Sequence, residues 1–217
     1  MIPTFKKYRK PVPKITCANQ IPGYLNTHTL DLLGSRISEL RENASVLEIG
    51  SLYGRLTWEI LTMLPKKGQL SVVESFGLTG IQALDNLKKL PESVNFLFPA
   101  REFDHKILWA LIITQHKRFN QLKLYATKSI DFIDRNKNLH WDLVWLDGCH
   151  RYNTVSAELS HFSTVTNEIW GDDYVFSIAS HLQVKAAVDD WYSKNKDDWD
   201  LTIHPHSVFQ LVRKNKS

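Results

Sequence analysis

Short apolar segments alternate with helix-like segments along most of the chain, and this alternation restricts the fold more than any other property of the sequence. Runs such as SerValLeuGluIle (45–49) end in turn residues and are followed by segments with helical apolar spacing. This order is typical of an α/β sandwich with a mainly parallel sheet. The last segments, LeuThrIleHis and SerValPheGlnLeuVal, predict an antiparallel hairpin instead. Strands are predicted at 45–49, 69–74, 122–126, 141–147 and 168–173, and helices at about 27–41, 56–64, 104–118, 130–135, 152–163 and 183–191.

Composition favours one folded domain. With 217 residues, of which 43% are hydrophobic, the chain can bury a full core. The apolar run 107–113 is far shorter than the roughly 18 residues of a membrane span, and no secretory signal is visible. Two cysteines, Cys17 and Cys149, form neither a disulfide framework nor a zinc cluster. We therefore expect a soluble, cytoplasmic protein without membrane contact.

Basic residues gather at the two ends of the chain. Residues 1–30 carry five Lys or Arg and no acid, and residues 213–217 carry three more. Subtracting this +8 from the net charge of +4 leaves −4 for the body. Such ends suit either solvation or contact with nucleic acid. We expect an extended basic arm (1–23) and one domain (24–217), in which residues 75–101 form an insertion or lid.

The first predicted strand runs into a glycine loop, GlySerLeuTyrGly (50–54). Ligands of parallel sheets bind at the carboxyl ends of the strands, where Gly50 and Gly54 let the backbone approach closely. The GxxxG spacing differs from the GxGxxG of pyrophosphate-binding folds, and no GxxxxGK[ST] is present. Glu48 would repel phosphate but suits a ligand with an amino or sulfonium group. Glu74, at the end of the second strand, is placed to accept hydrogen bonds from a ribose diol.

Four ordered motifs carry a resemblance to a known family. ValLeuGluIleGlySerLeuTyrGly with Glu74 resembles the class I S-adenosylmethionine-dependent methyltransferases. AspGlyCysHisArgTyr (147–152), GlyAspAspTyr (171–174) and AlaAlaValAspAspTrp (186–191) resemble the branch of macrocin O-methyltransferase and cephalosporin-hydroxylase-type proteins. The resemblance covers about residues 25–215. It implies a Rossmann-like three-layer sandwich with a seven-stranded sheet, and a homodimer is a further expectation from it.

The resemblance also implies a cofactor site for S-adenosylmethionine. Gly50, Ser51 and Gly54 would line the methionine half with Glu48 nearby, and Glu74 would hold the ribose. The family's Gly-x-Ser before the next helix reads ThrLysSer (127–129) here. Thr127 departs from that pattern at the adenine contact. The remaining residues expected to contact the cofactor are Lys128, Ser129 and Asp147.

Three carboxylates are expected at neighbouring strand ends. Asp147 ends one predicted strand, and Asp172 and Asp173 end the next. Carboxylates brought so close raise one another's pKa unless a cation binds them, and Mg²⁺ prefers oxygen ligands. We expect Asp147, Asp172 and Asp173 to hold Mg²⁺, as the related methyltransferases do. Capping carboxylates without a metal are the alternative.

A metal at this position would orient a substrate hydroxyl and lower its pKa for attack on the sulfonium methyl. His150 is then the candidate general base, or else a group that orients a carboxylate or a sugar hydroxyl. Asp147 is the other candidate base where it does not bind the metal. A nucleophilic Cys149–His150 pair is disfavoured because adjacent turn residues rarely point the same way.

The sequence therefore predicts a metal-assisted O-methyltransferase for a hydroxylated small molecule, such as a sugar or a secondary metabolite. The second hypothesis is a nucleic-acid-binding module or nucleic-acid methyltransferase that uses the basic ends. It is less favoured because the body is acidic. A third hypothesis is a metal-dependent relative without a methyl donor, which would bind metal but not S-adenosylmethionine.

Overall fold

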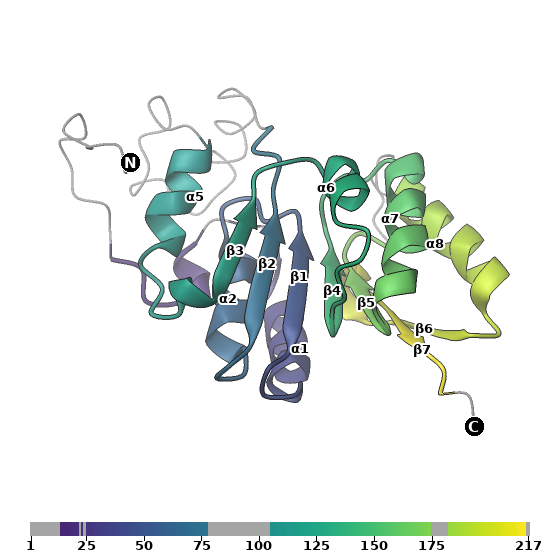
Figure 1. Ribbon diagram of the computed structural model, residues 1–217, viewed down its shortest axis with the longest axis horizontal. Helices are drawn as coiled ribbons and strands as arrows, with labels where there is room; N and C mark the ends of the chain where they lie inside the picture. Colours follow the sequence, from purple (N-terminus) through teal and green to yellow (C-terminus); the bar gives the residue numbers. More distant parts are fainter. Residues whose placement is uncertain (1–13, 22, 24, 78–104, 175–181, 216–217) are drawn as a thin grey trace.

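The computed structural model describes residues 14–21, 23, 25–77, 105–174 and 182–215 and contains one mixed sheet of seven strands (Figure 1). The strand order is β3-β2-β1-β4-β5-β7-β6. Strands β1 to β5 run parallel, whereas β7 is antiparallel to both β5 and β6. The predicted Rossmann-like α/β fold with a C-terminal antiparallel hairpin is confirmed. The strands are β1 (Ser45–Ile49), β2 (Gln69–Val73), β3 (Leu122–Tyr125), β4 (Leu143–Leu146), β5 (Glu168–Gly171), β6 (Trp199–Ile203) and β7 (Phe209–Arg213).

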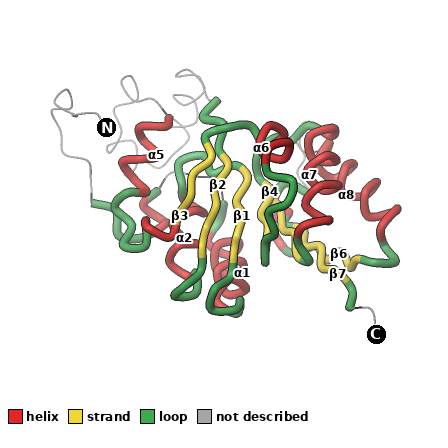
Figure 2. The backbone as a smooth tube through the Cα atoms, in the orientation of Figure 1, coloured by secondary structure: helices red, strands yellow, loops and turns green. Residues whose placement is uncertain are grey.

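Helices cover both faces of the sheet, which makes three layers (Figure 2). One buried apolar cluster joins one sheet face to α1, α2 and α5, and the other cluster joins the opposite face to α6, α7 and α8. Because helices cover both faces, β1, β2, β4 and β5 are buried along almost their whole length, and most of their residues are apolar. The helices are α1 (Thr27–Ser38), α2 (Arg55–Met63), α5 (His105–Ile113), α6 (Ser129–Arg135), α7 (Tyr152–Val165) and α8 (Leu182–Asn195), with short 3₁₀ turns η1 (Ala18–Gln20), η2 (Phe119–Gln121) and η3 (Pro205–Ser207).

Local signals account for several helix boundaries. Asn26 caps α1, because its Oδ1 accepts a hydrogen bond from the Thr29 backbone N–H at 2.9 Å. Pro65 follows directly after the C-cap of α2. The predicted helix 104–118 is shorter in the structure, because α5 ends at Ile113 and a turn leads on to η2.

The strand register aligns the carboxyl ends of the parallel strands at one edge of the sheet. Ile49 pairs with Val73 on one side and with Leu146 on the other, and Leu146 pairs with Gly171. The arrowheads of β1 to β3 point to the upper edge in Figure 1, and β4 runs parallel to β1. The loops after β1, β2, β4 and β5 therefore meet there, which is where parallel sheets bind ligands.

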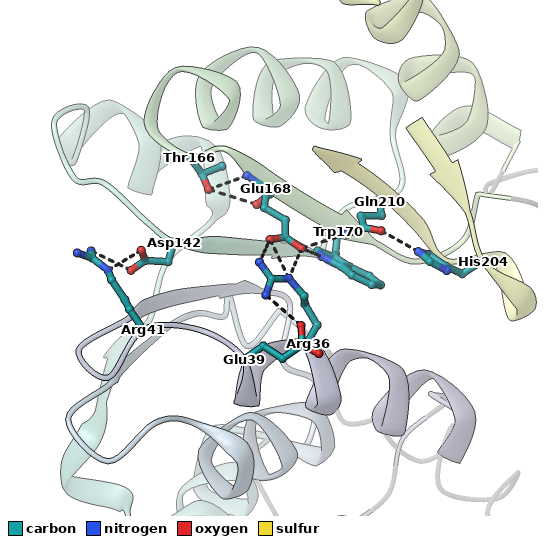
Figure 3. A network of polar contacts seen from close by, with 9 residues as sticks. All are labelled: Arg36, Glu39, Arg41, Asp142, Thr166, Glu168, Trp170, His204 and Gln210. Carbon is teal, nitrogen blue, oxygen red and sulfur yellow. Dashed lines mark hydrogen bonds and ion pairs between the residues drawn. The ribbon is translucent and has the colours of Figure 1, made fainter. Parts of the chain in front are cut away.

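A polar network fastens β5 on the α1 side of the sheet (Figure 3). Arg36 of α1 binds the buried Glu168 carboxylate with two nitrogens, at 3.0 Å to Oε1 and 2.7 Å to Oε2. The Trp170 indole and the Gln210 amide both donate to Glu168 Oε1, at 2.7 and 3.1 Å. His204 stacks on Trp170 with ring centroids 5.0 Å apart. Both carboxylate oxygens of the buried Glu168 accept hydrogen bonds. Glu168 therefore sets the position of β5 between α1 and β7.

The predicted arm and the predicted lid are described only in part. Within the arm, η1 packs against α2, and Ile15, Ala18 and Ile21 are buried in the core. Residues 1–13 and 78–104, which hold most of the basic arm and most of the segment 75–101, lie outside the described residues. Among the described helices, none combines the length and the apolar character needed to cross a membrane.

Candidate active site

A cleft of about 1040 Å³ opens at the carboxyl ends of the strands. Its walls come from the loops after β1 to β5 and from the first residues of α2, α5 and α6. All but one of the residues that the sequence predicts for the site line it. They are Glu48, Gly50, Ser51, Glu74, Lys128, Ser129, Asp147, His150, Asp172 and Asp173.

Gly50 is required where two loops meet. Its φ of 85° is in the left-handed region, and a Cβ added there would collide with the carbonyl of Asp147 and the Cα of Gly148. Gly50 therefore allows the loop after β1 to lie directly against the loop after β4. The Asp147 N–H donates to the Ile49 carbonyl at 2.8 Å, which extends the contact between the two loops.

Gly54 serves packing. It caps α2 with a φ of 88°, and a Cβ there would run into the Ile113 side chain of α5. Gly54 is the one predicted cofactor-binding residue that does not line the cleft. The second glycine of the GxxxG loop thus has a clear structural role in holding α2 against α5.

Glu74 ties the glycine loop to the end of β2. Its Oε2 accepts hydrogen bonds from the backbone N–H groups of Ser51 (2.8 Å) and Leu52 (3.0 Å). Its Oε1 accepts from the Phe76 N–H at 2.8 Å. Leu52 and Phe76 both have positive φ, of 49° and 51°. The carboxylate therefore offsets the cost of two strained residues and holds the loop in the shape that borders the cleft.

A buried hydrogen-bond chain lies behind the glycine loop. The Trp109 indole N–H donates to Ser51 Oγ (2.7 Å), Ser51 Oγ contacts Thr57 Oγ1 (2.6 Å), and Thr57 donates to Glu48 Oε2 (2.6 Å). Glu48 is fully buried, and Oε1 has no hydrogen-bond partner in the described part of the chain. Burial raises the pKa of Glu48 to about 8, with smaller contributions from the charges of Asp147 and Glu74. Glu48 is therefore mostly a neutral carboxyl at pH 7, not the anion expected from the sequence.

The third loop of the cleft contains Thr127, Lys128 and Ser129. Lys128 is exposed at the rim, and Ser129 begins α6. Behind Ser129 lies Glu158 of α7, which is buried and whose pKa rises to about 7 because of that burial. A hydrogen bond with Ser129 opposes this rise.

The loops after β4 and β5 bring three carboxylates around one imidazole. His150 Nε2 lies 2.9 Å from Asp173 Oδ2 and 3.7 Å from Asp147 Oδ1. One possible ligand atom from each of Asp147, His150 and Asp173 falls within 4.8 Å of the others. Asp172 Oδ1 accepts the N–H of Asp173, which has a φ of 65°. The structure thus adds His150 to the predicted aspartate group, and the tight triad contains His150 in place of Asp172.

The charges of this group are strongly coupled. Burial raises the pKa of Asp147 to about 6, against the opposing hydrogen bond of His150. Burial followed by the charge of Asp147 raises the pKa of Asp172 to about 7. Hydrogen bonds with Asp147 and Asp173 raise the pKa of His150 to about 10. At neutral pH the imidazole is therefore a cation that balances the carboxylates, and it can accept a proton only when another positive charge takes over that balance.

The donor set fits a divalent cation. Carboxylates that share a site favour a cation between them, and burial, which raises the pKa of Asp147 and Asp172, makes their ionisation more costly without one. Oxygen ligands suit Mg²⁺ or Mn²⁺, and imidazole adds affinity for transition metals.

Two cleft residues were not anticipated from the sequence. Arg55, the first residue of α2, donates to the Gly23 carbonyl (3.2 Å) and Asn19 Oδ1 (2.9 Å), which joins the arm to the cleft wall. His105, the first residue of α5, is buried and contacts the Leu52 carbonyl through Nε2. A basic residue after Gly54 was a visible signal for Arg55. His105 had none, because its position depends on how α5 packs against the glycine loop.

Comparisons with known proteins show the fold and no closer relationship. No family model matches the chain, and no curated protein matches it in sequence. Solved structures with similar folds include a Corynebacterium glutamicum protein, with a TM-score of 0.64 and 11% identity over 90% of this chain and 84% of the other. An O-methyltransferase from Bacillus cereus in complex with SAH gives a TM-score of 0.58 and 13% identity, over 90% and 86% of the two chains.

A third similar structure is the O-methyltransferase TomG from Streptomyces achromogenes, involved in tomaymycin synthesis and solved in complex with SAM. It gives a TM-score of 0.55 and 12% identity over 88% and 82% of the two chains. The chain therefore has the Rossmann-like fold that is also found in these methyltransferases. At these identities, the likeness extends to the fold alone.

Proposed function

We propose that the protein is an S-adenosylmethionine-dependent O-methyltransferase that uses a divalent cation. One observation carries the proposal: a single cleft joins the glycine loop and Glu74 to the Asp147, His150 and Asp173 group. A methyl donor and a cation-bound hydroxyl must lie side by side for transfer, and this cleft offers both kinds of site. The motifs shared with the macrocin O-methyltransferase branch support the same proposal.

In the proposed enzyme, the glycine loop and Glu74 bind S-adenosylmethionine. The Glu74 carboxylate accepts the ribose hydroxyls while Gly50 and the backbone of Ser51 border the methionine half. A neutral Glu48 leaves the nearby wall without a full negative charge. Thr127, Lys128 and Ser129 border the adenine. Asp147 lies next to Gly50, where the glycine-loop half of the cleft meets the half that contains Asp147, His150 and Asp173.

We keep Asp147, Asp172 and Asp173 as the proposed ligands of the cation, while the tightest group of ligand atoms in the structure contains Asp147, His150 and Asp173. When bound, Mg²⁺ or Mn²⁺ would lower the pKa of an acceptor hydroxyl and fix its direction. Transfer of the methyl group from sulfur to that oxygen would release the hydroxyl proton, which a base of the protein must accept. His150 serves as that base once a cation balances the aspartates, and Asp147 is the alternative base.

The acceptor is proposed to be a hydroxylated small molecule handled by a cytoplasmic enzyme, with a homodimer as the proposed assembly. The alternative, binding to nucleic acid, depends on basic ends that lie largely outside the described residues. It predicts affinity that falls steeply with salt and is lost when residues 1–14 and 213–217 are removed.

Calorimetric titration tests the proposal directly. S-adenosylmethionine and S-adenosylhomocysteine are titrated separately with Mg²⁺ and with EDTA. Binding of both supports the methyltransferase, and an acceptor screen with metal follows. Binding of metal without either ligand would favour the relative that uses no methyl donor.

Substitutions separate the metal from the cofactor. We expect Asp172→Asn and Asp173→Asn to keep cofactor binding and to lower kcat by about 100-fold or more, because each removes a charged ligand. Normal methylation by these variants in chelator would refute the metal role.

A further inference from the structure

Two tyrosines follow the two carboxylate-bearing loops, and both bind the same helix. Tyr152 begins α7 directly after the loop of Asp147 and His150, and its hydroxyl donates to Asp190 Oδ2 at 2.6 Å. Tyr174 directly follows Asp173, and its hydroxyl donates to Asp189 Oδ1 at 2.5 Å. Asp189 and Asp190 are consecutive residues of α8.

Consecutive helix residues point about 100° apart, so adjacent aspartates can reach two different loops. Further contacts reinforce each pair. Lys185, one turn before Asp189, binds that carboxylate and lies 4.8 Å from the Tyr174 ring centroid. The Tyr152 backbone N–H donates to Gln183 Oε1 at 3.1 Å. Each loop is therefore held by at least two contacts from α8.

The helix that presents these aspartates is itself firmly anchored. Val184, Ala187, Val188 and Trp191 are buried in the core cluster shared with α7 and the sheet. The apolar face of α8 is thus fixed, while its polar face carries Lys185, Asp189 and Asp190. A carboxylate on an anchored helix gives a tyrosine hydroxyl one preferred position.

We propose that α8 is a common brace for the two loops, in which Asp189–Tyr174 and Asp190–Tyr152 act as positioning pairs that set the spacing of Asp147, His150 and Asp173. The three sequence motifs that end in Tyr152, Tyr174 and Trp191 then form one unit, since the aspartates of the third motif hold the tyrosines of the other two. The effect on the loops is independent of the activity, whereas its consequence for methyl transfer rests on the function proposed above.

Hydrogen exchange tests the brace without requiring activity. Tyr152→Phe removes one hydroxyl and should speed amide exchange in residues 147–152, while Tyr174→Phe should do so in residues 171–174. Cys149 provides a second probe because it lies in the first loop, and the exposed Cys17 serves as its internal reference. Tyr152→Phe should raise the labelling rate of Cys149 relative to Cys17 by about fivefold, as expected when local opening costs less.

Tyr192→Phe is the matched control, because it removes a hydroxyl from the same helix that makes no hydrogen bond within the described residues. Rescue separates hydrogen bonding from charge: Asp190→Asn keeps an acceptor for Tyr152 and should retain slow exchange, whereas Asp190→Ala should not. Equal exchange in Tyr152→Phe and Tyr192→Phe would overturn the brace, as would a loss spread evenly over the whole chain.

Metal titration measures the consequence for the site. Tyr174→Phe should weaken Mg²⁺ or Mn²⁺ binding by about tenfold while affinity for S-adenosylmethionine stays within about twofold. If Tyr174→Phe lowered the affinities for the metal and for S-adenosylmethionine equally, the positioning role of Tyr174 would be overturned. If the wild type binds no S-adenosylmethionine, the proposed function fails, but the exchange and labelling results still decide the brace.

Discussion

The two halves of the cleft differ in which partners surround their carboxylates. In the glycine-loop half, Glu74 accepts backbone hydrogen bonds on both oxygens, and the buried Glu48 has its pKa raised to about 8. In the other half, where we propose the metal site, Asp147 and Asp172 have raised pKa values and His150 carries the balancing charge. In the first half the protein itself supplies the hydrogen bonds of Glu74, and burial keeps Glu48 mostly neutral. In the second half, the cation that we propose would offset the charges of the carboxylates.

This difference assigns separate tasks to the halves. The backbone N–H groups of the glycine loop donate to Glu74, which holds the loop in one shape. A fixed loop suits recognition of a ligand that must fit closely. Carboxylates that lie close together repel one another until a cation binds. Such a group suits a site where a substrate oxygen becomes negatively charged during the reaction. Gly50 is the contact at which the two halves touch.

The largest effect is expected from Gly50→Ala, which breaks both halves together. The added Cβ collides with the Asp147 carbonyl, and the φ of 85° disfavours any side chain. We expect a loss of about 3 kcal/mol or more in the free energy of unfolding, measured by urea denaturation. Gly77→Ala is the control, because its Cβ would have ordinary contacts. Equal stability of the two variants would contradict the close approach.

Glu74→Gln should break only the glycine-loop half. The amide nitrogen cannot accept the backbone N–H groups that Glu74 now binds, so both the loop and the ribose contact suffer. We expect affinity for S-adenosylmethionine to fall by about 100-fold, since charged hydrogen bonds are lost, while Mg²⁺ affinity is kept. Calorimetry measures both constants. Asp173→Asn should show the reverse pattern, and a parallel loss of both ligands in either variant would mean that the halves are not separate.

Metal binding should stabilise the protein more as pH rises. The pKa of His150 is raised from 6.5 to about 10, so its stabilising charge is complete below pH 6.5 and is lost as pH rises through 10. The pKa values of Asp147 and Asp172 are raised to about 6 and about 7, so the metal-free fold also loses stability as these groups ionise. A cation prefers the ionised carboxylates. Mg²⁺ should therefore raise Tm more at about pH 8 than at about pH 6. A shift that is the same at both pH values, or that persists in Asp173→Asn, would place the cation elsewhere.

The smallest effect is expected from Thr57→Val. This substitution keeps the shape of the side chain but interrupts the series of hydrogen bonds that runs from Trp109 to Glu48. Losing the hydrogen bond to Glu48 should cost about 1–2 kcal/mol of unfolding free energy. Because the Thr57 hydrogen bond lowers the pKa of Glu48, that pKa should rise further. Chemical denaturation and carboxyl NMR measure these changes. An unchanged pKa of Glu48 in Thr57→Val would show that the Thr57 hydroxyl does not stabilise the Glu48 carboxylate.

The secondary structure followed from local signals that the sequence displays. Apolar runs predicted every strand of the sheet, and helical apolar spacing predicted the described α-helices. The glycine loop and the three aspartates were found because strand ends are recognisable in the chain. The segment 75–101 offered no comparable pattern, and most of it lies outside the described residues.

Contacts between distant segments could not be predicted in the same way. The sequence predicts a ligand contact at Gly54, whereas in the structure Gly54 packs against Ile113 of α5. The sequence suggests a charged Glu48, but complete burial makes this carboxyl mostly neutral. In the sequence, the AspAsp of α8 is visible only as a motif, whereas the fold pairs these residues with Tyr174 and Tyr152.

By itself, the sequence determined the order of strands and helices and the edge of the sheet at which polar residues gather, because apolar spacing and turn residues act over a few neighbouring positions. Only the tertiary structure decided which carboxylates are neutral, which are bound by backbone amides and which share an imidazole. Those properties depend on burial and on partners that are far away in the chain, and neither is encoded in local spacing.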